Sequence, residues 1–286
     1  MNRRAAFLGL GLVAVLAVAL LWPYAGDDSL GRPRREGVIR VGYAVEPPYA
    51  FLAADGEVTG ESPQVAARIA GMLGIARVAW RQVEFGDLLA ELEAGRIDLI
   101  AAGMFVTPER MRRASFSLPS LHVAPGLLVA RGNPRHLADY ASASARPDVK
   151  FAVLAGAVEE DLLRRVGVGE DRLVRVPDAL TGRQAVASGL ADALVLSVPT
   201  LRWMVGRETP GATELIQAKG PNQDALARAY GQVAFAFRLE DRALGAAWNR
   251  ALGTYLGSPE HLRLLDSLGF SPAELPRPPR AGGALP

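Results

Sequence analysis

The stretch LEAGRIDLIAAGMFVTPER, residues 92–110, contains a helix end, a strand and the start of a second helix. Gly95 ends an amphipathic helical pattern, as glycine commonly does. The run RIDLIAAG that follows is typical of a buried strand, because it is short, apolar and bounded by glycines. Thr107 and Pro108 then predict a helix start, with the threonine as N-cap and the proline at the first helical position.

A second stretch, VASGLADALVLS, repeats the first part of this pattern at residues 186–197. Gly189 and Asp192 lie 94 residues after Gly95 and Asp98. Each stretch is a helix ending in glycine, a short turn and a buried strand. Strand and helix patterns also alternate elsewhere in the chain, which favours a largely parallel sheet. We therefore predict an α/β fold of two similar lobes.

The start of the first lobe has its own local signals. Residues 38–43 alternate as a strand does, and Asp55–Gly56 is typical of a hairpin turn. Ser62 and Pro63 predict the start of the next helix, with the serine as N-cap. A strand, a hairpin and a helix therefore open this lobe.

Composition excludes several classes of protein. The 286 residues are half apolar, which suits one or two globular domains. There is no cysteine, so disulfides, cysteine zinc sites and a lipid-modified cysteine are excluded. The three histidines are not spaced as metal ligands, and we expect no metal or cofactor. From Gly37 onward the chain has 27 basic and 27 acidic residues, which does not suggest a nucleic-acid partner.

The ends of the chain differ from its body. Residues 1–25 hold two arginines followed by 18 apolar residues, the pattern of a secretory signal or of an uncleaved membrane anchor. Residues 26–37 are polar and rich in glycine and arginine, which predicts a linker. Residues 277–286 predict a disordered tail. The body is thus expected to be exported, either free or tethered to the membrane.

Arg110 lies in the first turn of the helix that begins at Pro108. A cation there opposes the helix dipole, so its position calls for another explanation. A ligand carboxylate would meet both the guanidinium and free backbone N–H groups. Arg110 is equally consistent, taken alone, with a surface arginine.

These segments, together with EPPYAF and GLLVARGNP, resemble the bacterial family 3 extracellular solute-binding proteins, the periplasmic receptors of amino-acid-type ABC importers. The resemblance covers roughly residues 38–270. It implies a two-lobed periplasmic binding protein fold of type II, with a ligand cleft between the lobes and two hinge strands. The hinge crossings are expected near 128–132 and 233–237. The implied partners are a small zwitterionic ligand and a membrane permease, with the protein itself a monomer.

The same resemblance implies the lobe boundaries, with residues 38–130 and 237–276 in lobe 1 and residues 131–236 in lobe 2. It also implies roles for particular residues. Arg110 matches the family arginine that pairs with a ligand α-carboxylate, and Gly103 and Phe105 match neighbouring cleft positions. Amino-acid binders usually carry an aspartate where this chain has Ser197, which argues against an ordinary α-amino acid.

Within the family the pattern is most similar to ectoine- and hydroxyectoine-binding proteins. The positions that carry this similarity are Glu46, Tyr49, Phe85, Phe105 and Arg110. Ectoine has one carboxylate and one delocalised cation, so an arginine and several aromatic faces would suit it. The aromatic residues are also consistent with core packing, and Glu46 with a solvated loop.

A second-lobe helix start could add to the site. Gly156 through Val158 precede and open a predicted helix, and their N–H groups could bind a ligand carboxylate. The alternative is an ordinary helix entry.

Three function classes follow. The first is a binding protein of an importer, for ectoine or for a polar amino acid. The second is a cyclic-acid dehydratase on the same fold, but Glu46 is the only evident acid–base group and no paired base accompanies it. The third is a sensor module that signals through another subunit. We expect the binding protein, with no catalytic residues.

Overall fold

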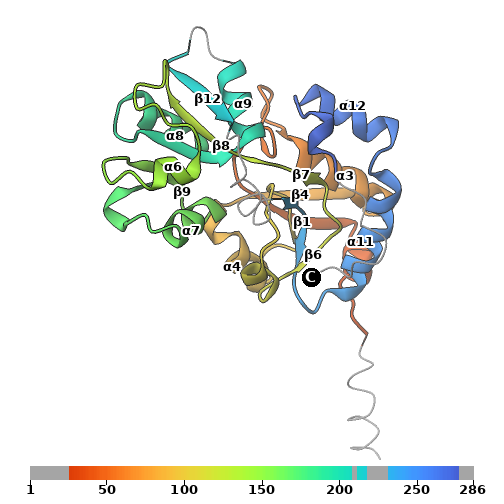
Figure 1. Cartoon of the computed structure of the whole chain (residues 1–286). Coiled ribbons are helices and arrows are strands. Elements are labelled where there is room, and N and C mark those ends of the chain that lie inside the picture. Colours follow the sequence, from red (N-terminus) through yellow and green to blue (C-terminus); the bar gives the residue numbers. More distant parts are fainter. Residues whose placement is uncertain (1–25, 208–210, 218–230, 277–286) are drawn as a thin grey trace, which may run out of the picture.

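Two lobes lie side by side in the computed structural model, which describes residues 26–207, 211–217 and 231–276 (Figure 1). Each lobe holds a five-stranded sheet with helices packed against it. The predicted signal or anchor at 1–25 and the predicted tail at 277–286 lie outside the described residues. The expected two-lobed α/β architecture is confirmed.

Lobe 1 is formed by segments from both ends of the chain. Its elements are α2 (Gly31–Glu36), β1 (Val38–Tyr43), β2 (Phe51–Leu52), β3 (Val58–Thr59), α3 (Glu61–Met72), β4 (Arg77–Gln82), η2 (Phe85–Asp87), α4 (Leu88–Glu93), β5 (Leu99–Ile100), α5 (Pro108–Met111), β6 (Ser115–Phe116), β14 (Ala236–Phe237), α11 (Arg242–Tyr255), α12 (Pro259–Ser267) and η4 (Pro272–Glu274). The strand order is β4-β1-β5-β14-β6, with β1 parallel to β4 and β5.

Alternation along β1 explains how lobe 1 is layered. Ile39 and Val41 point to one face, where they pack with α3 and with Trp248 of α11. The other face meets α4 through Leu88 and Leu92. The hairpin predicted around Asp55–Gly56 is confirmed, since β2 pairs antiparallel with β3.

Lobe 2 repeats the plan of lobe 1. Its elements are β8 (Pro125–Ala130), α6 (Tyr140–Ser144), β9 (Phe151–Leu154), α7 (Val158–Arg165), η3 (Glu170–Arg172), β10 (Leu173–Val176), α8 (Ala179–Ala187), β11 (Ala193–Ser197), α9 (Val198–Gly206) and β12 (Thr213–Gln217). The strand order is β10-β9-β11-β8-β12. In both lobes the first parallel strand lies between the second and the third, and antiparallel strands complete the sheet.

The two aspartates of the sequence repeat make the same contacts. Asp98 accepts a hydrogen bond from the backbone N–H of Arg40 at 2.9 Å and returns one from its own N–H to the Arg40 carbonyl at 2.7 Å. Asp192 does the same with Lys150, at 2.8 and 2.9 Å. Each aspartate therefore joins the beginning of the third strand to the beginning of the first, which accounts for the repeat.

The crossing between the lobes differs from the expected one. β7 (Leu121–His122) pairs antiparallel with β13 (Gln232–Val233), outside both five-stranded sheets. β8 pairs along its length with β11 and β12, so residues 125–130 belong to lobe 2 and the predicted boundary at 130 is too late. Ala236 pairs with Ile100 of lobe 1, so that lobe resumes before the predicted 237. An apolar strand alone does not reveal which sheet receives it.

The predicted linker at 26–37 is wrong, because this segment packs on lobe 1. Ser29 accepts a hydrogen bond from the N–H of Leu244 at 3.1 Å, at the beginning of α11. The Arg34 guanidinium donates to the carbonyl of Leu73 at 2.7 Å, at the end of α3. Helix ends leave backbone groups unpaired, and this polar segment satisfies some of them.

The carboxylate of Asp98 also forms ion pairs with arginine side chains. It is fully buried and accepts a hydrogen bond from Arg40 at 2.6 Å, with Arg32 and Arg238 against the same carboxylate oxygen. These ion pairs outweigh the burial of the carboxyl and hold the pKa of Asp98 below its ordinary value.

We expect Asp98→Ala to lower the free energy of unfolding by about 3–5 kcal/mol, because it leaves buried positive charge without its partner. Asp192→Ala is the matched control, since its side chain is a quarter exposed and carries fewer ion pairs. Asp192→Ala should lower the free energy of unfolding by clearly less than Asp98→Ala. Urea unfolding of both variants measures the difference, and equal losses would contradict the importance of the charge cluster.

Candidate functional site

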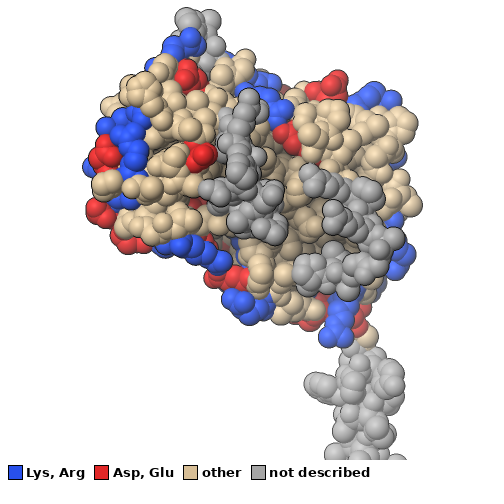
Figure 2. All heavy atoms as spheres, in the orientation of Figure 1, with Lys and Arg blue, Asp and Glu red and all other residues tan. Residues whose placement is uncertain are grey.

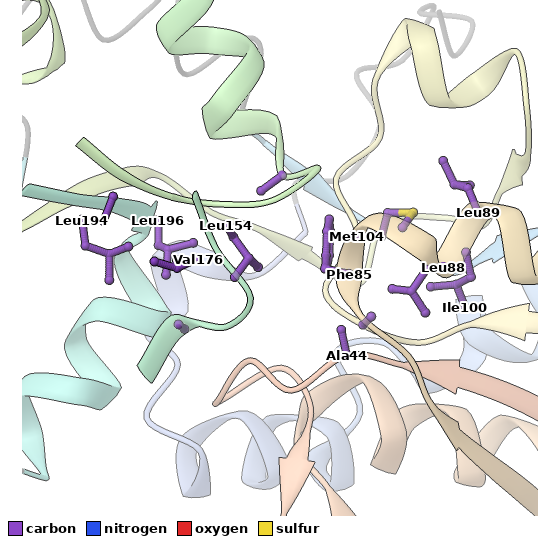
Figure 3. Packing of buried hydrophobic residues seen from close by; sticks show 14 of the residues in the cluster. Ala44, Phe85, Leu88, Leu89, Ile100, Met104, Leu154, Val176, Leu194 and Leu196 are labelled. Carbon is purple, nitrogen blue, oxygen red and sulfur yellow. The ribbon is translucent and has the colours of Figure 1, made fainter. Parts of the chain in front are cut away.

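The two lobes are in direct contact along an apolar seam. Figure 3 places Phe85 and Met104 of lobe 1 opposite Leu154 and Leu196 of lobe 2, within one cluster of buried side chains. A single cluster that contains residues of both lobes describes a closed arrangement. The predicted site residues gather at this seam or directly behind it.

Arg110 occupies the lobe 1 side of the seam. The predicted helix start is confirmed: the Thr107 hydroxyl accepts a hydrogen bond from the N–H of Arg110 at 3.1 Å, and Pro108 opens α5. The guanidinium donates to the carbonyl of Phe105 at 3.0 Å and, across the seam, to the carbonyl of Gly156 at 3.2 Å. It also lies 5.3 Å from the centre of the Phe85 ring. Arg110 is therefore held in place by backbone carbonyls of both lobes.

Burial makes Arg110 an unusual cation. Only 8% of the residue is exposed. Desolvation lowers the pKa of Arg110 from its ordinary value, and the negative charges of Glu159, Asp161 and Glu109 oppose the shift. Arginine stays protonated under such conditions, so a positive charge is present in a poorly hydrated place. An anion that enters the seam would meet it without much competition from water.

Gly156 contacts Arg110 through a different group than expected. Its carbonyl faces the guanidinium, while its N–H donates to the Glu160 carboxylate at 3.1 Å. The N–H of Ala157 donates to the carbonyl of Leu154 at 3.0 Å. These N–H groups are thus engaged in this conformation, and Val158 at the beginning of α7 contributes its apolar side chain to the seam.

Glycine at 156 has a clear steric reason. Its φ is +74°, and a Cβ there would lie 2.8 Å from the Cα of Gly86 in the other lobe. The backbones of the two lobes therefore touch at this point. This contact fixes how closely the lobes approach beside Phe85.

A cavity of about 250 Å³ opens next to Arg110. Its lining includes Phe85, Met104, Arg110, Gly156 and Val158, and charged side chains form the rim, among them Glu109, Arg113, Glu160, Asp161 and Arg164. The space would hold a small organic molecule, and it brings together four of the predicted site residues. Glu46, Tyr49, Gly103, Phe105 and Ser197 do not line it.

Glu46 and Tyr49 belong to a tight turn at the end of β1. The N–H of Tyr49 donates to the carbonyl of Glu46 at 2.9 Å, and the N–H of Glu46 donates to the carbonyl of Ala50 at 2.8 Å. The Glu46 carboxylate then crosses the seam and accepts the Thr200 hydroxyl of α9 at 2.7 Å. Burial raises the pKa of Glu46 to about 7, and the Thr200 hydrogen bond reduces the shift. This carboxyl is buried rather than solvated.

Tyr49 makes a second bond across the seam. Its hydroxyl lies 2.9 Å from the Ser197 hydroxyl, which is in turn 3.2 Å from that of Thr200. Glu46, Thr200, Ser197 and Tyr49 thus form a continuous polar chain between the lobes. Burial raises the pKa of Tyr49 well above its ordinary value. The Ser197 hydroxyl contacts two other protein hydroxyls. The family resemblance implies an aspartate at this position in amino-acid binders.

The rings of Tyr49 and Phe105 lie in another apolar cluster than Phe85. Tyr49, Phe105 and Val158 pack together with Phe270, whose ring centre is 5.7 Å from that of Tyr49. Gly103 lies beneath Tyr49: its φ is +66°, and a Cβ there would be 2.6 Å from the Tyr49 ring. Gly103 therefore permits the close approach of the tyrosine.

The C-terminal segment also joins the lobes, a feature the sequence did not reveal. Arg202 of α9 forms an ion pair with Glu274, whose carboxylate also accepts the N–H of Ser271 at 2.6 Å. Thr200 was likewise missed. The helix-starting sequence Ser197-Val-Pro-Thr could have indicated a hydroxyl in the first turn, but not its partner across the seam.

Charged side chains of both signs lie close together on the face shown in Figure 2, mainly around the margins of the two lobes. Among the helices in the described ranges, none is long and apolar enough to cross a bilayer.

The buried carboxyl of Glu46 predicts a pH dependence of closure. A pKa raised from 4.5 to about 7 favours the neutral acid in the closed form, so closure is favoured at acidic pH and loses roughly 3 kcal/mol as the pH rises through this window. The ligand-free protein should have a larger radius of gyration at about pH 8 than at about pH 5. Small-angle scattering measures it.

Two variants make this measurement specific. Glu46→Gln should show no change in radius with pH, whereas Glu84→Gln, an exposed carboxylate just before Phe85, should behave as wild type. A pH-independent radius in the wild type, or an unchanged dependence in Glu46→Gln, would contradict the role of Glu46.

Comparison with known proteins places the chain in a family. The profile of the bacterial extracellular solute-binding proteins, family 3, matches residues 39–267. A probable amino-acid ABC transporter periplasmic-binding protein, y4tE of Sinorhizobium fredii, is 30% identical over 282 residues, 95% of this chain and 91% of its own. The L-cystine-binding protein TcyJ of Escherichia coli is 28% identical over 195 residues, 68% of this chain and 71% of its own.

The solved structures agree. The crystal structure of EhuB in complex with hydroxyectoine matches with a TM-score of 0.78 and 32% identity, over 86% of this chain and 93% of EhuB. The family and these relatives are binding proteins, not enzymes, which removes the dehydratase alternative. A small-molecule ligand and a membrane permease are therefore the partners, and the family functions outside the cytoplasm. The chain belongs to the bacterial extracellular solute-binding proteins, family 3, and is the binding component of an amino-acid-type ABC importer.

Proposed function

We propose that this protein captures ectoine, hydroxyectoine or a similar small zwitterion with a delocalised cation. The observation that carries the proposal is the buried guanidinium of Arg110, placed beside Phe85 and on the carbonyl of Phe105. A cation and aromatic rings at one seam suit a compact molecule with a carboxylate at one end and a diffuse positive charge at the other.

The carboxylate would bind Arg110. The guanidinium donates to two neutral carbonyl oxygens. A carboxylate is a stronger acceptor, because the hydrogen bond is then assisted by charge, and it can bind both arms of the guanidinium at once. Exchange of carbonyl for carboxylate therefore favours the bound state.

The cation would bind among the aromatic rings and Glu46. Phe85 lines the cavity beside Arg110, and the rings of Tyr49 and Phe105 lie in a neighbouring cluster. The cation would lie between these rings. Each ring face contributes on the order of 0.5–2 kcal/mol to binding of a cation. Glu46 would supply a negative charge, since a bound cation lowers the cost of ionising a buried carboxyl. The bound hydroxyectoine of EhuB supports this ligand class.

Ser197 argues against an α-ammonium on the lobe 2 side. Its hydroxyl contacts those of Tyr49 and Thr200, and it has no charge to offer. An unpaired ammonium buried there would cost several kcal/mol. A delocalised cation is less strongly hydrated and avoids much of that cost.

A polar amino acid is the second candidate. The relatives y4tE and TcyJ are named for amino-acid and cystine binding. The buried carboxyl of Glu46 is the specific feature in its favour, because it could hold an α-ammonium from the lobe 1 side. Ligand ranking separates the two candidates.

Calorimetry should rank ectoine at least roughly tenfold tighter than histidine, arginine or glutamine, a gap of about 1.4 kcal/mol. Phe85→Leu and Phe105→Leu should each reduce this preference, because leucine keeps apolar volume without a π face. Phe151→Leu is the matched control, since Phe151 also lies near an arginine, 5.6 Å from Arg172, but packs in the interior of lobe 2. If a polar amino acid binds tightest, the amino-acid candidate replaces the proposal.

Arg110→Ala should weaken ectoine binding by about 2–5 kcal/mol while the unfolding temperature stays close to that of wild type. The control is Arg113→Ala at the rim of the cavity, where Arg113 already pairs with Glu93 at 2.7 Å. That variant should bind normally. Wild-type affinity in Arg110→Ala would refute the role of the arginine.

A further inference from the structure

We call the rings of Tyr49, Phe85 and Phe105 the aromatic cage. The turn that carries Tyr49 and the loop that carries Phe105 are both hydrogen-bonded to the beginning of α3. The N–H of Glu61 donates to the carbonyl of Pro48, and the N–H of Ser62 donates to the carbonyl of Tyr49, both at 3.0 Å. The first N–H groups of a helix have no partners inside it. Here they hold the turn that carries Glu46 and Tyr49.

The side chains of the same two residues hold the second loop. The Ser62 hydroxyl donates to the Glu61 carboxylate at 2.7 Å and accepts the N–H of Gly103 at 3.2 Å. Gly103 is the residue that lies under the Tyr49 ring, two positions before Phe105. Because the hydroxyl proton is fixed by Glu61, the oxygen of Ser62 is left to face Gly103.

Ser62 thus has another role than the predicted one. The helix begins at Glu61 with Gly60 as N-cap, so Ser62 is not the capping residue. Its hydroxyl and the carboxylate of Glu61 are instead buried, and Glu61 has no exposed surface. In the described part of the chain no arginine or lysine forms an ion pair with Glu61.

A buried carboxyl without a cation is costly. Burial raises the pKa of Glu61 above its ordinary value, and the side chains of Ser120 and Ser62 oppose the shift. Ser120 lies in the crossing between the lobes, where its N–H donates to the carbonyl of Val233 at 2.8 Å. An apolar residue at position 61 would avoid this cost. The polar group therefore calls for a function other than stability.

We propose that Glu61 and Ser62 are positioning residues for the ligand site: together they fix the Pro48–Tyr49 turn and Gly103 relative to each other, and so present Tyr49 and Phe105 to the ligand. Neither touches the ligand. Ectoine binding as a readout rests on the proposed function, whereas hydrogen exchange of the Gly103 amide does not.

The test compares Glu61→Leu, Glu61→Gln and Ser62→Ala, with Gln64→Ala on the exposed side of α3 as control. Glu61→Leu should keep or raise the unfolding temperature yet weaken ectoine binding about tenfold, because the site loses its arrangement while the helix gains apolar packing. Glu61→Gln keeps an acceptor oxygen and should restore binding. In ligand-free Ser62→Ala, the amide hydrogen of Gly103 should exchange about tenfold faster by NMR.

The outcomes are distinguishable. Wild-type affinity for ectoine in both Glu61→Leu and Ser62→Ala overturns the proposal. The proposal is also overturned if the variants lose affinity in step with their unfolding temperature and Glu61→Gln does not restore binding. If the wild type does not bind ectoine at all, the proposed function fails, and the exchange of Gly103 then decides the positioning role alone: unchanged exchange in Ser62→Ala overturns it.

Discussion

A buried arginine at the contact between two lobes is the constraint on which the rest of the site depends. Arg110 lies in the single turn of α5, and it is nearly inaccessible to water. Two carbonyl oxygens, one from each lobe, hold its guanidinium. Those oxygens are neutral, so an anionic group that binds the guanidinium would form a stronger, charge-assisted hydrogen bond.

The polar contacts of the closed seam are of the kind a ligand can replace. Tyr49 contacts Ser197 and Glu46 contacts Thr200, each between the lobes and each through side-chain oxygens. A zwitterion placed between Arg110 and Glu46 would exchange some of these bonds for stronger, charge-assisted ones. The ion pair of Arg202 with Glu274 lies outside this exchange and would continue to join the lobes.

Sequence reasoning predicted the features that follow local rules. The two-lobed plan follows from Gly95–Asp98 and Gly189–Asp192, because each aspartate joins neighbouring strands of its own lobe. The helix start at Thr107 depends only on three adjacent residues. By contrast, the placement of residues 125–130 in lobe 2 depends on strand pairing with distant segments. The packing of residues 26–37 depends on helix ends far along the chain.

The candidate site likewise combines features that follow from local sequence with features that depend on distant contacts. Its candidate residues could be selected from motifs, but their partners could not, since Thr200 meets Glu46 over 154 positions of sequence and Ser62 meets Gly103 over 41. Gly156 was selected for its N–H and contributes its carbonyl instead, because Glu160 occupies the N–H. Such exchanges depend on side-chain geometry that spacing alone does not contain.

A crystal structure of the protein with ectoine tests the central claim most directly. The proposed account predicts that the ligand carboxylate lies on the Arg110 guanidinium, in place of at least one of the carbonyl contacts to Phe105 and Gly156. It predicts the ring of the ligand between Tyr49, Phe85 and Phe105, with Glu46 beside it. Density for ectoine elsewhere, with the bonds of Arg110 to both carbonyls unchanged, would contradict the account.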